Sequence, residues 1–122
     1  MIKSIAILKR KPGLSREEFI KHYEEVHAPL VLKHIPMLRR YVRNHVIPVS
    51  SPHNNSEPDF DCITEFWVDD MEGSQEAGDI WTSEAGRAIR EDEETFLDRS
   101  KIITFLVEEK VSAIQCNIQS PP

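Results

Sequence analysis

A chain of 122 residues has the length of one domain and is long enough to bury a hydrophobic core of its own. Its composition, with 39% hydrophobic and 30% charged residues, is that of a globular protein. The formal net charge of −6 argues against nucleic acid as a partner, because phosphate binding depends on clustered Lys and Arg.

Two cysteines and five histidines give no recognisable metal or disulfide pattern. Cys62 and Cys116 fit no CxxC spacing, so neither a disulfide framework nor a cysteine zinc site is expected. The absence of HxxH and HExxH spacings argues against a protein-bound metal. The first residues do not resemble a signal peptide, and no apolar run approaches the roughly 20 residues that span a bilayer. We therefore expect a cytoplasmic protein without a membrane partner.

The first predicted elements are a strand and a helix. Residues 2–9 are rich in Ile and Leu and predict a buried strand. Ser15, with Glu18 three residues later, has the pattern of a helix-capping box. Because Pro29 disfavours helical geometry at the residue before it, the helix is expected to kink or end near His27. A short second helical piece is expected over residues 31–34.

The remaining elements complete a ferredoxin-like order. They are, in turn, a strand over 38–49, a loop over 50–58, a strand over 60–68, weak helical character over 69–79, a helix over 83–97 and a strand over 101–109. The order β-α-β-β-α-β predicts an α+β domain with a four-stranded antiparallel sheet. We expect one domain over residues 1–110, followed by a C-terminal tail over 111–122.

Both faces of the predicted sheet carry apolar residues. In the last strand Ile103 and Phe105 point to one side, while Ile102 and Leu106 point to the other. Helices in this topology cover one face only, so the second face needs another cover. A second copy of the chain, packed sheet to sheet in a dimeric α/β barrel, is the simplest one. The alternative is a tail that folds back over the sheet.

Two polar residues interrupt the apolar stripes of the predicted helices. His27 follows Tyr23 by four residues and shares its buried stripe. Asp92 lies between Ile89 and Phe96 on the packing face of the later helix, where a carboxylate is costly unless it is paired. For His27 the alternative is a core histidine bonded to a backbone carbonyl. The other acids of the later helix (Glu91, Glu93 and Glu94) and the histidines His22 and His34 are expected at the surface.

Acids also occur on the third strand. Asp61 and Glu65 share a face with Ile63 and Trp67, although a solvated position at the strand end remains open for Asp61. Tyr41 on the second strand offers a hydroxyl donor. One histidine and several carboxylates set against apolar walls are suited to general acid–base chemistry in a dry pocket.

Several short motifs together resemble the EthD family. They are Lys11-Pro12-Gly13-Leu14-Ser15 with Glu18-Phe19, then His27-Ala28-Pro29-Leu30, Arg40-Tyr41, Phe60-Asp61, Glu65-Phe66-Trp67, Glu91-Asp92-Glu93 with Phe96-Leu97-Asp98, and Val107-Glu108-Glu109. The resemblance runs from about residue 2 to residue 110. It implies a ferredoxin-like subunit, a dimeric α/β barrel, and a polar lining that includes His27, Asp61 and Asp92.

The resemblance implies a range of roles. Similar proteins include a component linked to bacterial ether degradation, methylmuconolactone isomerases, and fungal enzymes that dehydrate or decarboxylate aromatic polyketides. The enzymes among them work without metal or organic cofactor, so none is expected here. A shared fold does not assign a reaction.

The leading hypothesis is a cofactor-independent lyase or isomerase that acts on a small cyclic or aromatic metabolite. In it His27 is the general base or acid, oriented by Asp61 or Asp92. Tyr41 and Glu65 position a polar substituent of the substrate, and Trp67 supplies an apolar wall. The second hypothesis is a non-catalytic accessory dimer that binds a hydrophobic small molecule. The third is a haem-binding or oxygen-using barrel, which no haem motif supports.

Overall fold

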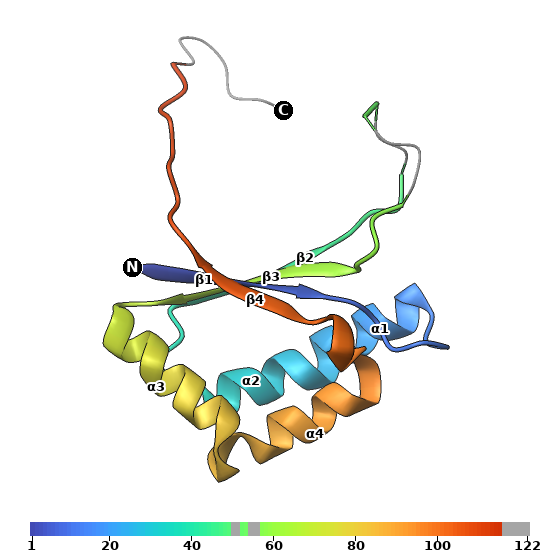
Figure 1. Ribbon diagram of the computed structural model, residues 1–122, viewed down its shortest axis with the longest axis horizontal. Coiled ribbons are helices and arrows are strands. Elements are labelled where there is room, and N and C mark those ends of the chain that lie inside the picture. Colours follow the sequence, from blue (N-terminus) through green and yellow to red (C-terminus); the bar gives the residue numbers. More distant parts are fainter. Residues whose placement is uncertain (50–51, 54–56, 116–122) are drawn as a thin grey trace.

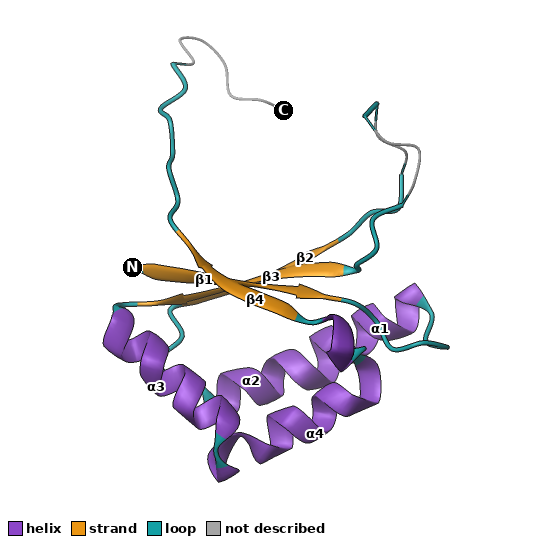
Figure 2. Cartoon of the chain, viewed as in Figure 1, coloured by secondary structure: helices purple, strands orange, loops and turns teal. Residues whose placement is uncertain are grey.

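The computed structural model describes residues 1–49, 52–53 and 57–115 and shows one sheet with all helices on one of its faces (Figures 1 and 2). The four strands are β1 (Ile2–Leu8), β2 (Arg40–His45), β3 (Cys62–Val68) and β4 (Ile103–Val107). They pair antiparallel in the order β2-β3-β1-β4. The predicted α+β ferredoxin-like fold is confirmed. Cys116 and part of the predicted loop over 50–58 lie outside the described residues.

The helices form the second layer. They are α1 (Arg16–His22), a π-helical segment (Tyr23–His27), α2 (Ala28–His34), α3 (Met71–Thr82) and α4 (Arg87–Phe96), with short 3-10 turns at Glu84–Gly86 and Arg99–Lys101. The helix α3 is longer and more regular than the weak character expected there, because the Asp70 side chain accepts from the Gly73 N–H at 2.8 Å and caps its first turn.

The expected capping box at the start of α1 is confirmed. The Ser15 hydroxyl accepts from the Glu18 N–H at 3.1 Å, and the Glu18 carboxylate accepts from the Ser15 N–H at 2.9 Å. These two bonds satisfy backbone donors that have no partner within the helix. The carboxylate is stabilised by the same bonds, which lower the pKa of Glu18.

Of the two expectations near His27, an end of the helix is wrong, while the regular α-helix is interrupted there. The chain continues as helix through Pro29 to His34, with a π-helical turn in which the Ala28 N–H donates to the Tyr23 carbonyl. Proline lacks an N–H and its ring clashes with the carbonyl four residues earlier in a regular α-helix. The wider π turn relieves that clash, and it leaves His27 in the middle of a long helix.

The core lies between the sheet and the helices. Phe19 and Tyr23 from the first helix pack against Phe96 of α4 and against the inner face of the sheet, where Cys62 and Thr64 are completely buried. Strand alternation places the even-numbered residues of β1, β3 and β4 on this inner face. Removal of these apolar side chains from water supplies most of the stability of the packing between the sheet and the helices.

The outer face of the sheet has no helix over it (Figure 1). Its apolar residues include Ile5, Ile7 and Ile63, which are half-buried, and Ile103 and Phe105, which are 55% and 42% exposed. The described part of the tail, to Gln115, is exposed and runs away from the sheet (Figure 1). Up to that residue, the tail therefore does not cover the outer face.

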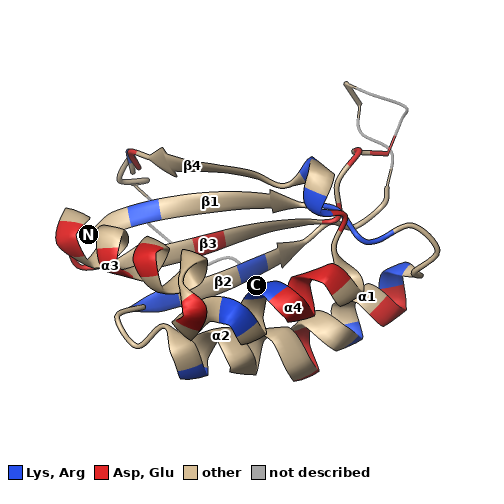
Figure 3. Ribbon diagram, turned by 60° about the horizontal axis from the view of Figure 1, so that its bottom comes forward, with Lys and Arg blue, Asp and Glu red and all other residues tan. Residues whose placement is uncertain are grey.

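Charge is distributed unevenly between the two layers. Acidic residues are numerous along the helices, whereas β1 carries a single basic position and β3 a single acidic one (Figure 3). Those two are Lys3 and Glu65, whose side chains pair at 3.2 Å on the outer face. The outer face thus carries apolar side chains around a small charged group, in which Lys3 also pairs with Glu109 at 2.9 Å.

Candidate active site

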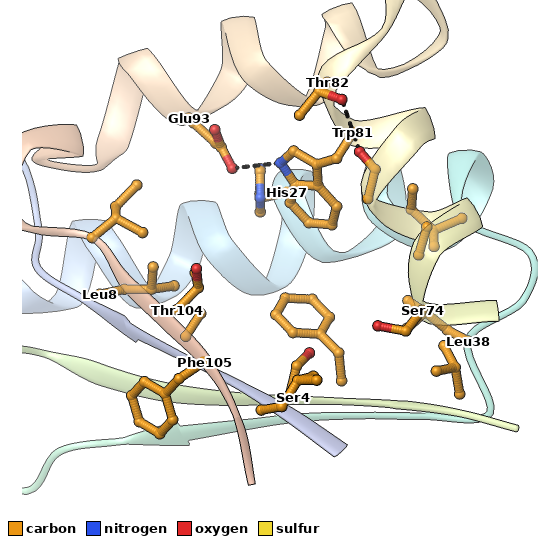
Figure 4. A pocket seen from close by; sticks show the side chains of 18 of the residues that line it. Ser4, Leu8, His27, Leu38, Ser74, Trp81, Thr82, Glu93, Thr104 and Phe105 are labelled. Carbon is orange, nitrogen blue, oxygen red and sulfur yellow. Dashed lines mark hydrogen bonds between the residues drawn. The ribbon is translucent and has the colours of Figure 1, made fainter. Parts of the chain in front are cut away.

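A cavity of about 530 Å³ lies between the inner face of the sheet and the helices (Figure 4). Its floor comes from β1, β3 and β4, including Ser4, Leu8 and Thr104, and its helical wall includes His27 and Trp81. A volume of this size is typical of sites for small organic molecules. Most of the lining is apolar, with a few polar groups from both the strands and the helices.

His27 is one of these polar groups and is held by Asp92. The imidazole is 3% exposed, and its Nδ1 lies 2.8 Å from Asp92 Oδ2. Because an ionised carboxylate only accepts hydrogen bonds, Nδ1 carries the proton and donates. The ring lines the cavity, and among the described residues no hydrogen bond involves its Nε2. The arrangement therefore presents an unprotonated Nε2 to the cavity.

The local sequence explains how these two residues meet. His27 lies in the π turn and Asp92 in the middle of α4, and these two helical segments pack against each other through Phe96. The Phe96 ring lies 4.7 Å from both the His27 and the His22 rings, measured between centroids. An apolar ring on one side and a carboxylate on the other fix the orientation of the imidazole.

His22, which was expected on the helix surface, is partly exposed and is also bound to Asp92. Its Nε2 lies 2.9 Å from Oδ1 and 3.0 Å from Oδ2 of the carboxylate, and its side chain is 28% exposed. The residue lies one turn before His27 on the same side of the helix, so both rings reach one carboxylate. His22 does not line the cavity and contacts Asp92 from the solvent side.

Burial shapes the chemistry of His27. Desolvation lowers the pKa of His27, while the hydrogen bond and charge of Asp92 act in the opposite direction and a nearby His22 lowers it further. The net effect favours the neutral imidazole. A neutral ring with a fixed tautomer is a competent general base near neutral pH.

Glu93 is a cavity residue that the sequence pattern did not reveal, and its expected solvated position is wrong. The residue is 8% exposed, and its Oε2 accepts from the Trp81 indole N–H at 3.1 Å. Its side chain lines the cavity together with those of Trp81 and Arg99. The sequence shows only that a tryptophan lies twelve residues before Glu93. The geometry of the turn that brings the two side chains together could not be predicted.

Tyr41 lies beside the cavity and is absent from its lining. Its ring stacks on Phe66 with centroids 5.2 Å apart, and its hydroxyl donates to the Tyr23 hydroxyl at 3.2 Å. Tyr23, which does line the cavity, is bonded in turn to the Thr64 hydroxyl at 2.7 Å. Burial raises the pKa of both tyrosines, so these hydroxyls stay protonated and act as donors.

The three other site residues expected from the sequence lie away from His27. Glu65 and Trp67 alternate with the cavity residues of β3, so they point to the outer face of the sheet. There the Trp67 indole N–H donates to Glu65 at 3.2 Å, and Lys3 pairs with the same carboxylate. Asp61 accepts from the Arg10 N–H at 2.8 Å at the start of β3 and lines a separate small surface pocket.

No group of three or more His, Cys, Asp and Glu side chains suited to a metal ion was found in the part of the chain that the structure describes. Within the same residues, every helix is too short or too polar to cross a membrane.

Cys62 is a free, buried thiol whose pKa is raised to about 11, mainly by burial, and it is therefore inert.

Solved structures share this architecture. A protein from Bacillus halodurans described as an ethyl tert-butyl ether D (EthD) family protein is 27% identical, with a TM-score of 0.64, over 90% of this chain and 100% of that one. An EthD-like protein from Ralstonia eutropha is 18% identical, with a TM-score of 0.62, over 95% of each chain. A dimeric ferredoxin-like protein from an uncultured marine organism is 20% identical, with a TM-score of 0.59, over 93% of this chain and 98% of that one.

The family model for the EthD domain matches residues 11–100, which hold all of α1 to α4 and the helical wall of the cavity. A search of curated proteins finds no match. The matched span covers well over half of the 122 residues and includes His27, Asp92 and Glu93. The chain belongs to the EthD family.

Proposed function

We propose that the protein catalyses a proton transfer on a small, mostly apolar cyclic metabolite, as a lyase or isomerase that uses no cofactor, with His27 as the general base. The observation that carries the proposal is the histidine–carboxylate pair at the cavity wall. Asp92 fixes the proton on Nδ1 of His27 at a distance of 2.8 Å, and Nε2 is left to accept a proton from a bound molecule.

The cavity supports this chemistry in a second way. Its apolar walls exclude bulk water from a substrate of suitable size, which strengthens every polar interaction inside it. The charge that forms on His27 when it takes a proton is balanced by Asp92, which is already in contact. His22 holds the carboxylate from the other side, so little rearrangement is needed during the reaction.

The experiment begins with identification of the ligand. Small molecules that co-purify with the protein are identified by mass spectrometry, and turnover of each is measured for the wild type and for His27→Gln. We expect the variant to lose about 10²- to 10⁴-fold in kcat, the usual contribution of a general base. Lys33→Gln, a change at an exposed position of α2, is the control and should keep full activity.

A non-catalytic binding protein is the competing outcome. Its cavity would hold the same molecule unchanged, and His27→Gln would alter only the dissociation constant. Wild-type protein that binds a co-purified molecule without converting it, whatever the pH, would rule out the catalytic proposal.

We propose further that two copies associate through the outer faces of their sheets. The unshielded face is apolar, and large exposed apolar patches mark interaction surfaces in soluble proteins. A two-fold axis lets the same patch serve both subunits. The protein of similar fold from the uncultured marine organism is described as dimeric, which supports the proposal. Sedimentation at micromolar concentration tests it, and a compact monomer would contradict it.

A further inference from the structure

Glu93 is a buried acid that the histidine–carboxylate pair does not use. It follows Asp92 on α4, and a step of one residue turns the side chain by about 100° around a helix. Asp92 therefore faces His22 and His27, whereas Glu93 faces α3 and the cavity. One helix thus supplies two acids for two different purposes.

The surroundings of Glu93 are largely apolar, with one neutral donor. The Trp81 indole N–H bonds to Oε2 at 3.1 Å, and the Arg99 guanidinium lies 3.9 Å from Oε1. Arg99 itself is 44% exposed and donates to the neighbouring Glu94 at 3.0 Å, so its charge is shared and hydrated. Burial raises the pKa of Glu93, although Trp81 and the arginines Arg99 and Arg90 oppose the shift.

Glu93 and His27 enter the cavity from the same helical wall. Figure 4 shows both side chains at its upper side, with the Trp81 ring beside them and the strand residues below. Both groups also line the same cavity of about 530 Å³, so a molecule that fills this cavity would lie against both. Burial lowers the pKa of His27 and raises the pKa of Glu93. It therefore favours the neutral form of each group, which is a proton-free imidazole for His27 and a protonated carboxyl for Glu93.

We propose that Glu93 is the second proton-transfer group of this cavity and works as the acid that complements the His27 base, on an uncharged carbonyl compound with an enolisable carbon. The inference rests on the proposed function of the cavity and adds a residue and a substrate class to it. Nε2 of His27 takes the proton from the carbon next to the carbonyl, and the electron pair of that C–H bond moves toward the oxygen. Glu93 gives its proton to a second atom of the same conjugated system.

The cycle balances without any further reagent. The substrate loses one proton and gains one, while His27 becomes an imidazolium and Glu93 a carboxylate. Asp92 and the Trp81 N–H stabilise these two charged groups at the distances given above. After the product leaves, water in the open cavity returns the proton from His27 to Glu93, and both groups are neutral again.

Dicyclohexylcarbodiimide provides a test that needs no substrate. This apolar reagent takes a proton from a carboxylic acid, and its central carbon then bonds to the carboxylate oxygen to give an O-acylisourea. Migration of the acyl group from oxygen to nitrogen turns this adduct into a stable N-acylurea that peptide mass spectrometry locates. We expect modification of Glu93 at a rate that falls about tenfold for each pH unit above the pKa of this carboxyl. Glu93→Gln should remove the label, and Glu91→Gln, at an exposed acid of the same helix that pairs with Arg87, should leave it unchanged.

The Trp81 indole gives an independent readout of the same proton. Its ¹H–¹⁵N signal should shift with pH in the wild type and stop shifting in Glu93→Gln, which keeps an acceptor oxygen but cannot ionise. Lack of label at Glu93 would overturn the inference, because the carboxyl would then lack a proton or be closed to the cavity. If Glu93 is labelled but His27→Gln retains full turnover, the proposed base is wrong while the acid in the cavity remains.

Discussion

At the scale of single residues, Asp92 has the strongest influence on the site because one carboxylate serves two imidazoles. His27 and His22 both lie within 3.0 Å of its oxygens, from opposite ends of a single helical turn. Such sharing fixes the ring of His27 more firmly than one bond would, since rotation of the carboxylate would break the contact with His22 as well. The site is therefore built as a unit of three side chains.

Asp92→Asn should weaken the base in two measurable ways. The carboxylate raises the pKa of His27 by hydrogen bond and charge, so its removal lowers this pKa further below 6.5. Because the neutral imidazole is the active form, the rising limb of the pH–rate profile moves to lower pH, while the plateau falls by roughly 100-fold. Histidine NMR titration checks the pKa without a substrate. A titration midpoint for His27 that rises in the variant would contradict the role of Asp92.

The sequence allowed part of this site to be predicted. His27 and Asp92 were found because each interrupts an apolar stripe, and stripes follow directly from helical periodicity. Glu93 lies beside the stripe, and its burial depends on Trp81, which α3 brings over α4. Glu65 and Trp67 were placed with His27 although strand alternation directs them to the other face of the sheet. The sequence showed that these residues share one face of the strand. It did not show which face of the sheet lines the cavity, because periodicity alone does not carry that information.

At the scale of elements, the turn between α3 and α4 holds the cavity wall in place. Gly86 is buried there, and a Cβ on it would lie 2.3 Å from the Ile80 carbonyl oxygen and 2.7 Å from that of Trp81. These are backbone atoms of the last turn of α3, so they cannot move aside alone. The close approach of the two helices therefore requires glycine, and it positions Trp81 over Glu93.

Gly86→Ala should destabilise the fold by about 1–3 kcal/mol, the usual cost of overpacking. Gly78→Ala is the matched control, because a Cβ at that position of α3 meets nothing within 4 Å and alanine favours a helix by up to about 1 kcal/mol over glycine. Urea unfolding of the two variants measures the difference. Equal stability of the pair would show that the α3–α4 turn relaxes freely.

Glu24 connects the π-helical segment to β2 and should respond to acid. Its carboxylate accepts from Arg43 at 2.7 Å and contacts His45 at 2.8 Å, and mainly the Arg43 bond lowers the pKa of Glu24 from 4.5 to about 2. A depressed carboxyl pKa contributes stability above pH 4.5 that is lost as the pH falls toward 2. The stability advantage of wild type over Glu24→Gln should shrink across this window. An advantage that does not depend on pH would contradict the ion pair, and Glu25→Gln, at an exposed neighbour, is the control.

Element order and pairing were predictable, whereas the course of the first helix was not. The strands showed short apolar runs or, over residues 38–49, an alternating pattern, and the β-α-β-β-α-β order predicted the sheet topology. The rule for the residue before proline predicted an end near His27, but the π turn offered a second way to accommodate Pro29. Rules based on local sequence describe only the energetic cost of proline in a regular α-helix. Tertiary packing against α4 favours the irregular helix instead.

At the scale of the whole molecule, two segments extend on the side of the sheet that has no helices. Figure 2 shows the chain after β2 and the chain after β4 rising from the outer face on opposite sides. Most of their described residues are exposed and include large apolar side chains, among them Ile47, Val49, Val111 and Ile114 at 67–83% exposure. A second subunit on the outer face would lie between these segments, which accords with the proposed dimer.

Ile103→Glu should separate the proposed dimer into monomers. Ile103 is 55% exposed on the outer face of β4, and a carboxylate there would be buried without a partner against the second sheet, at a cost of several kcal/mol. Leu32→Glu is the matched control, because Leu32 is 54% exposed on the helical side and loses the same type of side chain. Sedimentation velocity at micromolar concentration should give a monomer for the first variant and a dimer for the second. Because the cavity opens on the opposite face of the sheet, His27 should keep its titration in both variants, and a dimer that survives Ile103→Glu would place the interface elsewhere.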